Sequence, residues 1–316
     1  MVTTPFHNEP HLFADYGRFL SGLFPFKVQK LSVNGGFGCP NRDGTLSHGG
    51  CAYCNNQTFV PAYCLPTDSI RQQLEKGKLF FRRKYPDMRF LAYFQAHTNT
   101  YAPLPVLRRA YHEALSVDGV VGLVIGTRPD CVSPALLDEL AELSQRVHVL
   151  IEYGVESTRD EQLSDLGRGH TFKQAEIAIR QTAERGIYTA AHMILGLPDD
   201  TPETLLLQPA QLSALPIHVL KLHQLQIVRH TLMENQYAEH PERFDMLFAT
   251  PEQYASFLCQ YIARLRPTIV LERFTSQSPS EMLIAPRWGI KNHEFVALLR
   301  RELKRQGLWQ GKHYGV

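Results

Sequence analysis

The chain has 316 residues, of which 44% are hydrophobic and 20% charged, and its formal net charge is +2. This composition excludes a disordered chain, and so small a net charge points to no particular class of partner. No stretch approaches the roughly 18 apolar residues of a membrane span, and the first residues lack the basic and apolar regions of a signal peptide. We therefore expect a cytoplasmic protein without membrane contact, whose six cysteines are thiols or metal ligands rather than disulfides.

Apolar strands alternate with helical patterns along most of the chain. The predicted strands cover residues 28–33, 89–95, 120–125, 147–155, 188–195, 218–226 and 268–274. The predicted helices run from a cap at 67–69 to about 84, over 103–116, from Ser133-Pro134 onward, over 171–185 and 201–215, from Thr250 onward, and over 292–305. Residues 227–249 form the longest stretch without a predicted element and are a candidate lid or insertion. Apolar strands separated by helices indicate a parallel α/β sheet, either a barrel or an open doubly wound sheet.

The most informative residues lie in a glycine-rich loop after the first predicted strand. Eleven residues separate Cys39 from Cys51, and two separate Cys51 from Cys54. Thiolates suit iron–sulfur clusters and zinc. Three protein ligands on a four-iron cluster would leave one iron open, whereas Cys64 or His48 as a fourth ligand would complete a structural zinc site. Cys131 and Cys259 lie among apolar residues and are expected in the core.

Unusual polar residues stand at the ends of several predicted strands. Chemistry collects at the carboxyl ends of the strands in parallel α/β barrels, so one site at the barrel mouth would gather them. They are Gln95, His97, Thr98, Asn99, Thr100, Tyr101, Arg128, Asp130, Glu152, Glu156, Ser157, His192, His223, Gln224 and Gln226. Arg128 is expected either to clamp an anion or to pair with Asp130 or Glu152. Glu272 and Arg273 are expected to contact substrate or to form ion pairs.

Six motifs together resemble the radical S-adenosylmethionine (SAM) superfamily, in particular its YhcC-like branch. They are Cys39-Pro-Asn-Arg-Asp-Gly, Cys51-Ala-Tyr-Cys54, Thr127-Arg-Pro-Asp130, Gly154-Val-Glu-Ser157, Arg168-Gly-His170 and Gly196-Leu-Pro198. The chain is also similar to the radical SAM domain of the elongator acetyltransferase subunit and, more distantly, to oxygen-independent coproporphyrinogen oxidases. The resemblance implies a partial, open TIM-like β/α barrel over residues 28–274, between an N-terminal extension (1–27) and a C-terminal helical extension (275–316).

The resemblance also implies a reaction. A reduced 4Fe-4S cluster passes one electron to SAM, and cleavage gives methionine and a 5′-deoxyadenosyl radical that abstracts a substrate hydrogen. The electron would come from a donor such as flavodoxin or ferredoxin. The elongator-like resemblance favours an RNA substrate, in particular a tRNA uridine. A small metabolite is the alternative, and a zinc-stabilised barrel that only binds RNA or protein is the non-catalytic alternative.

Residue roles follow from the motifs that match. By this resemblance Cys39, Cys51 and Cys54 are the cluster ligands, and Tyr53 packs near the SAM adenine. The remaining SAM-binding candidates are Thr98, Asn99 and Thr100 for the amino group, Glu156 for the ribose, Arg168 for the carboxylate, and His192 in place of a strand aspartate. The chain departs from the family pattern in its long first cysteine gap, in Gly126, which replaces a glutamate, and in the absence of Gly-Gly-Glu after Gln95.

Two basic segments, residues 71–89 and 291–316, carry most of the local positive charge. Such segments are typical of solvated helix faces, and they can also contact a phosphate backbone. The RNA hypothesis predicts that they form one positive surface beside the barrel mouth. The residues concerned are Arg82, Arg83 and Lys84 in the first segment and Arg300, Arg301, Lys304 and Arg305 in the second.

Overall fold

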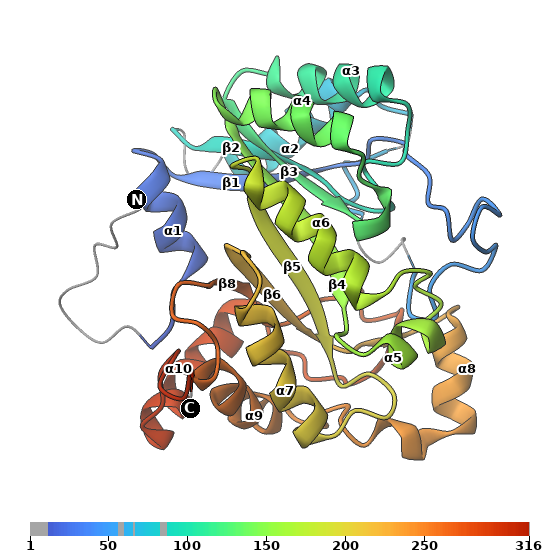
Figure 1. Cartoon of the computed structure of the whole chain (residues 1–316), viewed down its shortest axis with the longest axis vertical. Helices are drawn as coiled ribbons and strands as arrows, with labels where there is room; N and C mark the ends of the chain where they lie inside the picture. Colours follow the sequence, from blue (N-terminus) through green and yellow to red (C-terminus); the bar gives the residue numbers. More distant parts are fainter. Residues whose placement is uncertain (1–11, 56–59, 66, 83–86, 316) are drawn as a thin grey trace.

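The fold is a half-barrel of parallel strands, seen in a computed structural model that describes residues 12–55, 60–65, 67–82 and 87–315 (Figure 1). The seven-stranded sheet contains β1 (Val28–Val33), β2 (Arg89–Phe94), β3 (Val120–Thr127), β4 (His148–Glu156), β5 (Tyr188–Leu195), β6 (Val219–Gln224) and β8 (Val270–Arg273). Neighbours in the sheet follow chain order and pair in parallel. This order confirms the expected partial barrel. In the alternative, an open doubly wound sheet, the strand order would reverse at a switch point.

The outer helices begin where the sequence places their caps. These helices are α2 (Ile70–Arg82), α3 (Leu104–Leu115), α4 (Pro134–Ser144), α6 (Phe172–Glu184), α7 (Pro202–Ser213), α9 (Pro251–Ala263) and α10 (Asn292–Gln306). The hydroxyls of Ser133, Thr171, Thr201 and Thr250 each accept a first-turn backbone N–H. Each cap therefore fixes the start of a helix that returns the chain to the amino end of the next strand.

Residues 227–249, where no element was predicted, contain short elements, and their role as a lid or insertion stays a prediction. They form β7 (Ile227–Val228), α8 (Leu232–Glu239) and a 3-10 turn, η3 (Pro241–Phe244), and β7 pairs antiparallel with β9 (Leu283–Ala285). Helix α8 buries only Met233 fully. So short a helix with one buried residue leaves little periodic signal in a sequence. The short helices α1 (Tyr16–Leu23) and α5 (Asp160–Asp165) and the turn η2 (Pro129–Cys131) were not predicted either.

Helix α1 closes the amino end of the half-barrel. The lowest layer of interior side chains is apolar and consists of Leu91, Val124, Leu150, Ala190, Val219 and Val270. Tyr16 and Leu20 of α1 pack against this layer from below. The barrel is therefore a filled core at this end, and any opening lies at the carboxyl ends of the strands.

A layer of charged side chains lies above the apolar one. Lys30 Nζ on β1 is 2.5 Å from Glu152 Oε1 on β4 and 2.7 Å from Glu272 Oε1 on β8. Lys221 Nζ on β6 is 2.7 Å from the other oxygen of Glu152. Because β1 and β8 are the two edges of the sheet, the Lys30–Glu272 pair joins edges that no backbone hydrogen bond joins. Of the two roles expected for Glu272, it thus forms an ion pair.

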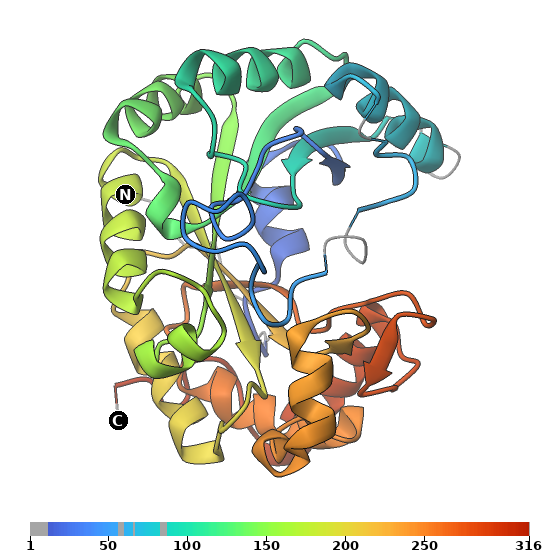
Figure 2. The same ribbon diagram turned by 90° about the vertical axis from the view of Figure 1, so that its right-hand side faces the viewer.

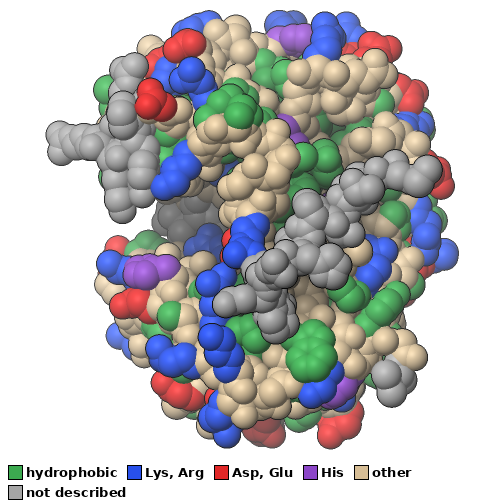
Figure 3. Space-filling model, turned by 90° about the vertical axis from the view of Figure 1, so that its left-hand side faces the viewer, with side chains coloured by type: hydrophobic (Ala, Val, Ile, Leu, Met, Phe, Trp, Pro, Cys, Tyr) green, Lys and Arg blue, Asp and Glu red, His purple; other side chains and the backbone are tan. Residues whose placement is uncertain are grey.

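The basic residues of α10 lie at the amino end of the barrel, so the prediction that they flank the mouth is wrong. Helix α10 starts beside the end of β8, where the Phe274 N–H donates to Asn292 Oδ1 at 3.3 Å, and runs back antiparallel to that strand. Arg300 consequently reaches Asp15, the N-cap of α1, at 3.5 Å. Figure 3 views this face, where several Lys and Arg side chains lie near the middle. The side chain of Arg82, and Arg83 and Lys84, fall outside the described residues.

Candidate active site

The cysteine loop lies across the carboxyl ends of the strands, drawn in blue at the centre of Figure 2. Backbone hydrogen bonds tie it to three parts of the fold. The Thr98 N–H after β2 donates to the Gly38 carbonyl at 3.1 Å, and the Ala52 N–H donates to the Leu166 carbonyl at 2.9 Å. The Met233 N–H of α8 donates to the Ala52 carbonyl at 2.9 Å. The loop is thus held as part of the barrel mouth.

Two side chains donate to the Cys51 sulfur. Asn41 Nδ2 is 3.3 Å and Arg168 Nη1 is 3.5 Å from Cys51 Sγ. Arg42 Nη2 lies 3.2 Å from the Cys54 carbonyl and 3.9 Å from Cys54 Sγ. Donors and positive charge aimed at sulfur favour the thiolate, which is the form that binds a metal. All six cysteines are outside disulfides, so the donor set fits a thiolate-bound cluster.

Burial works against the thiolate until a metal binds. Burial and the neighbouring Cys51 raise the pKa of Cys54 to about 11, although Arg42 acts in the opposite direction. Because a thiol must lose its proton to become a ligand, cluster assembly at this loop releases protons.

Arg168 connects the cysteine loop to the end of β4. Its Nη2 donates to the Gly154 carbonyl at 2.6 Å and lies 3.9 Å from Glu156 Oε1. Burial opposes the positive charge, but Tyr53, Cys51 and Glu156 hold the pKa of Arg168 well above its usual range. Its Nε lies 3.2 Å from His170 Nε2. Burial and Arg168 lower the pKa of His170 to about 4, so this imidazole is neutral and accepts the bond.

A missing side chain at Gly154 makes room for this arrangement. A Cβ on Gly154 would lie 2.7 Å from Glu156 Oε1 and 2.9 Å from Arg168 Nη2. Glu156 itself adopts a left-handed backbone conformation, with φ at 67°, where β4 and β5 lose register. Such a conformation in a non-glycine residue is strained and is common at functional sites. Half-buried Tyr53 packs against an apolar group that includes Leu166 and Leu197.

Thr98, Asn99 and Thr100 are all buried and brace the ends of β2 and β3. Asn99 Nδ2 donates to the Gly126 carbonyl at 2.8 Å. The Thr100 hydroxyl lies 2.5 Å from both the Thr127 hydroxyl and the Cys131 carbonyl. They thus stand beside the cysteine loop, and their SAM contacts stay predictions.

Three other candidates, Arg128, His192 and His97, lie in different surroundings. Arg128 forms a two-pronged ion pair with Asp130, at 3.0 and 2.8 Å, which was one of the two roles expected for it. His192 Nε2 lies 2.9 Å from Glu152 Oε2, inside the half-barrel. His97 is exposed at the rim.

The remaining cysteines are not arranged as metal ligands. The Cys64 thiol is buried and donates to the Ser32 carbonyl at 3.1 Å, and burial raises its pKa to about 11. Cys259 lies in the core, as expected. Among the described residues no three His, Cys, Asp or Glu side chains converge as a single metal ion requires.

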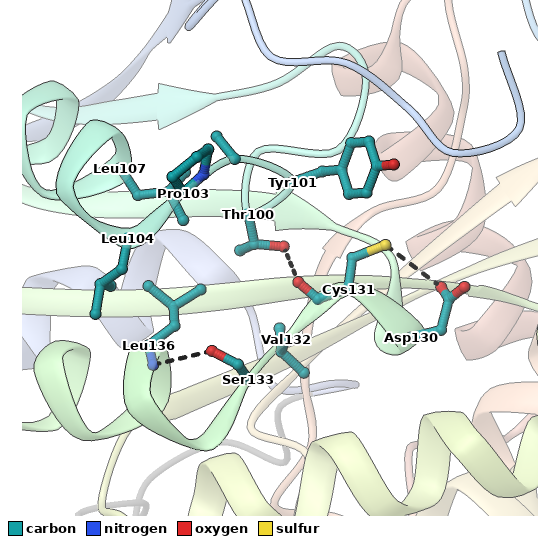
Figure 4. A pocket seen from close by; sticks show the side chains of 11 residues that line it. Thr100, Tyr101, Pro103, Leu104, Leu107, Asp130, Cys131, Val132, Ser133 and Leu136 are labelled. Atoms are coloured by element: carbon teal, nitrogen blue, oxygen red, sulfur yellow. Dashed lines mark hydrogen bonds between the residues drawn. The ribbon is translucent and has the colours of Figure 1, made fainter. Parts of the chain in front are cut away.

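Cys131 lines a cavity instead of lying in the core, which corrects that expectation (Figure 4). The cavity measures about 520 Å³ and lies where α3 and α4 begin. Tyr101 forms part of its wall, and the Tyr101 hydroxyl is 2.9 Å from the Thr45 hydroxyl of the cysteine loop. The cavity therefore borders the back of the loop, outside the barrel.

Sequence reasoning missed four side chains of this region. Asn41 and Arg42 stand inside the quoted motif Cys39-Pro-Asn-Arg-Asp-Gly, so the motif itself was the signal that could have identified them. Lys30 and Lys221 lie within apolar strands, where a lone lysine signals a buried ion pair.

Family models match the chain on both sides of this site. The radical SAM superfamily model matches residues 33–206, more than half of the chain, and the Radical_SAM C-terminal domain model matches residues 217–305. The chain belongs to the radical SAM superfamily. It is an enzyme of that family, whose cofactors are a 4Fe-4S cluster and SAM.

Relatives match along nearly the whole length. The chain is 33% identical to YhcC of Escherichia coli over 95% of this chain and 94% of that protein. It is 31% identical to YtqA of Bacillus subtilis, over 98% of this chain and 95% of that protein.

Two solved structures share the fold. The archaeal Elp3 of Methanocaldococcus infernus, lacking its N-terminus, has a TM-score of 0.64 at 14% identity; the match covers 90% of this chain and 64% of that one. Methylornithine synthase (PylB) has a TM-score of 0.50 at 13% identity, over 90% of this chain and 83% of that one.

Among the described residues, no helix combines the length and apolar content that a membrane crossing needs.

Proposed function

We propose that this enzyme uses its cluster and SAM to abstract a hydrogen atom from an RNA substrate, a tRNA uridine. The bound cluster would supply one electron to SAM, whose cleavage to methionine yields the 5′-deoxyadenosyl radical that takes the hydrogen. The observation that carries the proposal is the link from Cys51 through Arg168 to the Gly154 carbonyl. It joins the cluster loop to the carboxyl end of β4, where barrel enzymes hold their substrates.

The chain's own residues would do three things. Cys39, Cys51 and Cys54 would hold three irons and leave the fourth for SAM. Asn41 and Arg168 would stabilise the negative charge of the Cys51 thiolate, because each donates a hydrogen bond to its sulfur, and Arg42 would do the same for Cys54 from 3.9 Å. Arg168 and Glu156 would offer a cation and an anion to the charged ends of SAM. An electron donor of the flavodoxin or ferredoxin type would reduce the cluster.

A group of arginines at the mouth supports a polyanionic substrate. Arg42, Arg229 and Arg287 are exposed, and none of them forms an ion pair with a described carboxylate. Asn55, next to Cys54, donates to the Arg229 carbonyl at 3.0 Å. Arg229 and Arg287 flank the paired strands β7 and β9. We call these three residues the arginine rim.

The cluster assignment is tested by single Cys→Ala variants. Replacing Cys39, Cys51 or Cys54 should each abolish the iron content of the anaerobically reconstituted protein, whereas Cys131→Ala and Cys259→Ala should retain it. A full iron content in the Cys51→Ala variant would refute the assignment.

The substrate class is tested by tRNA retention on filters across a salt series. Each phosphate contact releases counterions, so binding should weaken steeply with salt. The variant Arg229→Glu/Arg287→Glu should bind tRNA more weakly than the wild type. The control Arg301→Glu/Lys304→Glu reverses the same amount of charge on α10 and should bind normally. Weak, salt-insensitive binding in all three proteins would favour a small-molecule substrate.

A further inference from the structure

Two histidines inside the half-barrel have no role in the cluster or in its charge stabilisation. His192 lies on β5 and His223 on β6, and their ring centroids are 5.9 Å apart. His192 pairs in register with Gly154, whose carbonyl accepts from the same Arg168 that donates to Cys51. His192 is therefore one strand, and His223 two strands, away from Gly154, whose carbonyl holds the arginine that contacts the cluster loop.

Glu152 fixes the orientation of His192. Its carboxylate lies 2.9 Å from Nε2, so in the neutral ring Nε2 donates to Glu152 and Nδ1 is the acceptor. The side chain of Glu152 is fully buried, whereas 20% of the His192 side chain is exposed. The ring thus has one edge on the charged layer and another toward the open interior.

His223 presents an unused polar atom beside this ring. Its Nε2 is buried and has no hydrogen-bond partner among the described residues. Burial, together with the charge of Arg273, holds the pKa of His223 well below its ordinary value, so the ring is neutral. An unpaired buried nitrogen costs free energy unless a ligand or water satisfies it.

The layer beneath the two rings is balanced in charge. Lys30 and Lys221 face Glu152 and Glu272, with contacts of 2.5 to 3.5 Å between the four side chains. Two lysines and two glutamates leave no net charge, so this layer favours a substrate that forms hydrogen bonds over one that is an ion.

We propose that His192 and His223 form the floor of the substrate site and hydrogen-bond an uncharged ring edge that carries both an N–H and a C=O group, as a pyrimidine base does. The His192 Nδ1 accepts from the N–H of the base. The His223 Nε2–H donates to the C=O of the base, which supplies the hydrogen bond that this atom otherwise lacks. This inference rests on the proposed function, because it places a nucleobase over the barrel floor. It assigns substrate-contacting residues that are separate from the cluster loop.

The test separates the two nitrogens of His192. Asparagine places an amide near the Nδ1 position, whereas glutamine places one near Nε2. With tRNA from cells lacking this enzyme as the probe, His192→Gln should keep its bond to Glu152 yet lose about tenfold or more in kcat/KM for tRNA-dependent 5′-deoxyadenosine formation. His192→Asn should recover part of the loss, and His223→Ala should show a similar loss. His112→Ala, on the outer face of α3, should behave as the wild type.

Two further readouts distinguish a substrate contact from a structural defect. Iron content should be unchanged in the histidine variants, and the slow SAM cleavage that occurs without tRNA should be unchanged in His223→Ala. If the wild type responds to tRNA and His192→Gln responds equally, the floor assignment is wrong and the proposed function survives. If the wild type itself shows no response to tRNA, the RNA substrate is wrong and the floor proposal falls with it.

Discussion

At the scale of single residues, the site depends on a position where a side chain is absent. Gly154 leaves space for the tips of Arg168 and Glu156, and a Cβ would approach both within 3.0 Å. Both tips are flexible, so Gly154→Ala should displace them rather than unfold the barrel. The displaced Arg168 would leave the Cys51 sulfur and the Gly154 carbonyl.

We predict that Gly154→Ala lowers the affinity for the cluster or for SAM by about tenfold or more, as losses of groups that support metal ligands do. Iron retention during dialysis against a chelator and equilibrium binding of SAM measure this. Gly22→Ala is the control, because nothing lies within 4 Å of its Cβ on α1. A Gly154→Ala variant that retains iron and binds SAM as the wild type does would contradict the role of Arg168.

At the scale of elements, α1 closes the amino end of the half-barrel by packing against its lowest apolar layer. Leu20 is 8% exposed against the apolar layer, whereas Leu23 on the same helix is 38% exposed. Leu20→Ala should reduce the free energy of unfolding by about 2–4 kcal/mol, and Leu23→Ala by much less. Urea denaturation of both variants under anaerobic conditions provides the comparison. Equal losses would mean that α1 does not pack into the barrel.

The stability of the amino end of the barrel should also depend on pH. His148, at the start of β4, lies with its ring centroid 5.8 Å from that of Phe24 and 5.0 Å from that of Tyr188. Burial, with a smaller effect of Lys30, lowers its pKa to about 4. The unfolded chain binds a proton at this residue below about pH 6.5, whereas the folded chain stays neutral. Its contribution to stability is therefore present above that pH and lost as the pH falls toward 4.

His148→Gln should remove this share of acid sensitivity. Between pH 7 and pH 4.5 the wild type should lose more stability than the variant, by up to about 3 kcal/mol. Urea midpoints at a series of pH values measure the difference. Parallel pH profiles for the two proteins would exclude His148 as a source of the acid sensitivity.

At the scale of the whole molecule, a side-chain pair spans the open side of the half-barrel. Lys30 and Glu272 are 242 residues apart in the sequence and join the two edge strands. Removing one partner of a buried ion pair leaves an uncompensated charge, so Lys30→Met should cost about 3–5 kcal/mol. The double variant Lys30→Met/Glu272→Met should be less destabilised than the sum of the single variants. Additive effects in urea unfolding would show that the pair does not couple the edges.

The sequence was informative where its signals are local. Strand and helix periodicity and the helix caps at Ser133 and Thr250 predicted a parallel α/β sheet, and the family resemblance carried by the cysteine motif and its companion motifs predicted the half-barrel. The ion-pair layer escaped because each lysine or glutamate reads alone as a polar residue in a strand, and Lys30 meets Glu152 only 122 residues later. The basic residues of α10 were misplaced because a run of charges does not indicate which way its helix runs. In a β/α barrel each helix returns toward the amino ends of the strands, and this return sets the direction.

The most direct test of the account is SAM cleavage by the reconstituted enzyme. With the iron content verified, dithionite-reduced protein is incubated with SAM under anaerobic conditions, with and without tRNA, and the products are separated by chromatography. We predict 5′-deoxyadenosine and methionine in equal amounts from the wild type, and no 5′-deoxyadenosine from the Cys51→Ala variant. Fully loaded, reduced wild-type protein that yields no 5′-deoxyadenosine under either condition would contradict it.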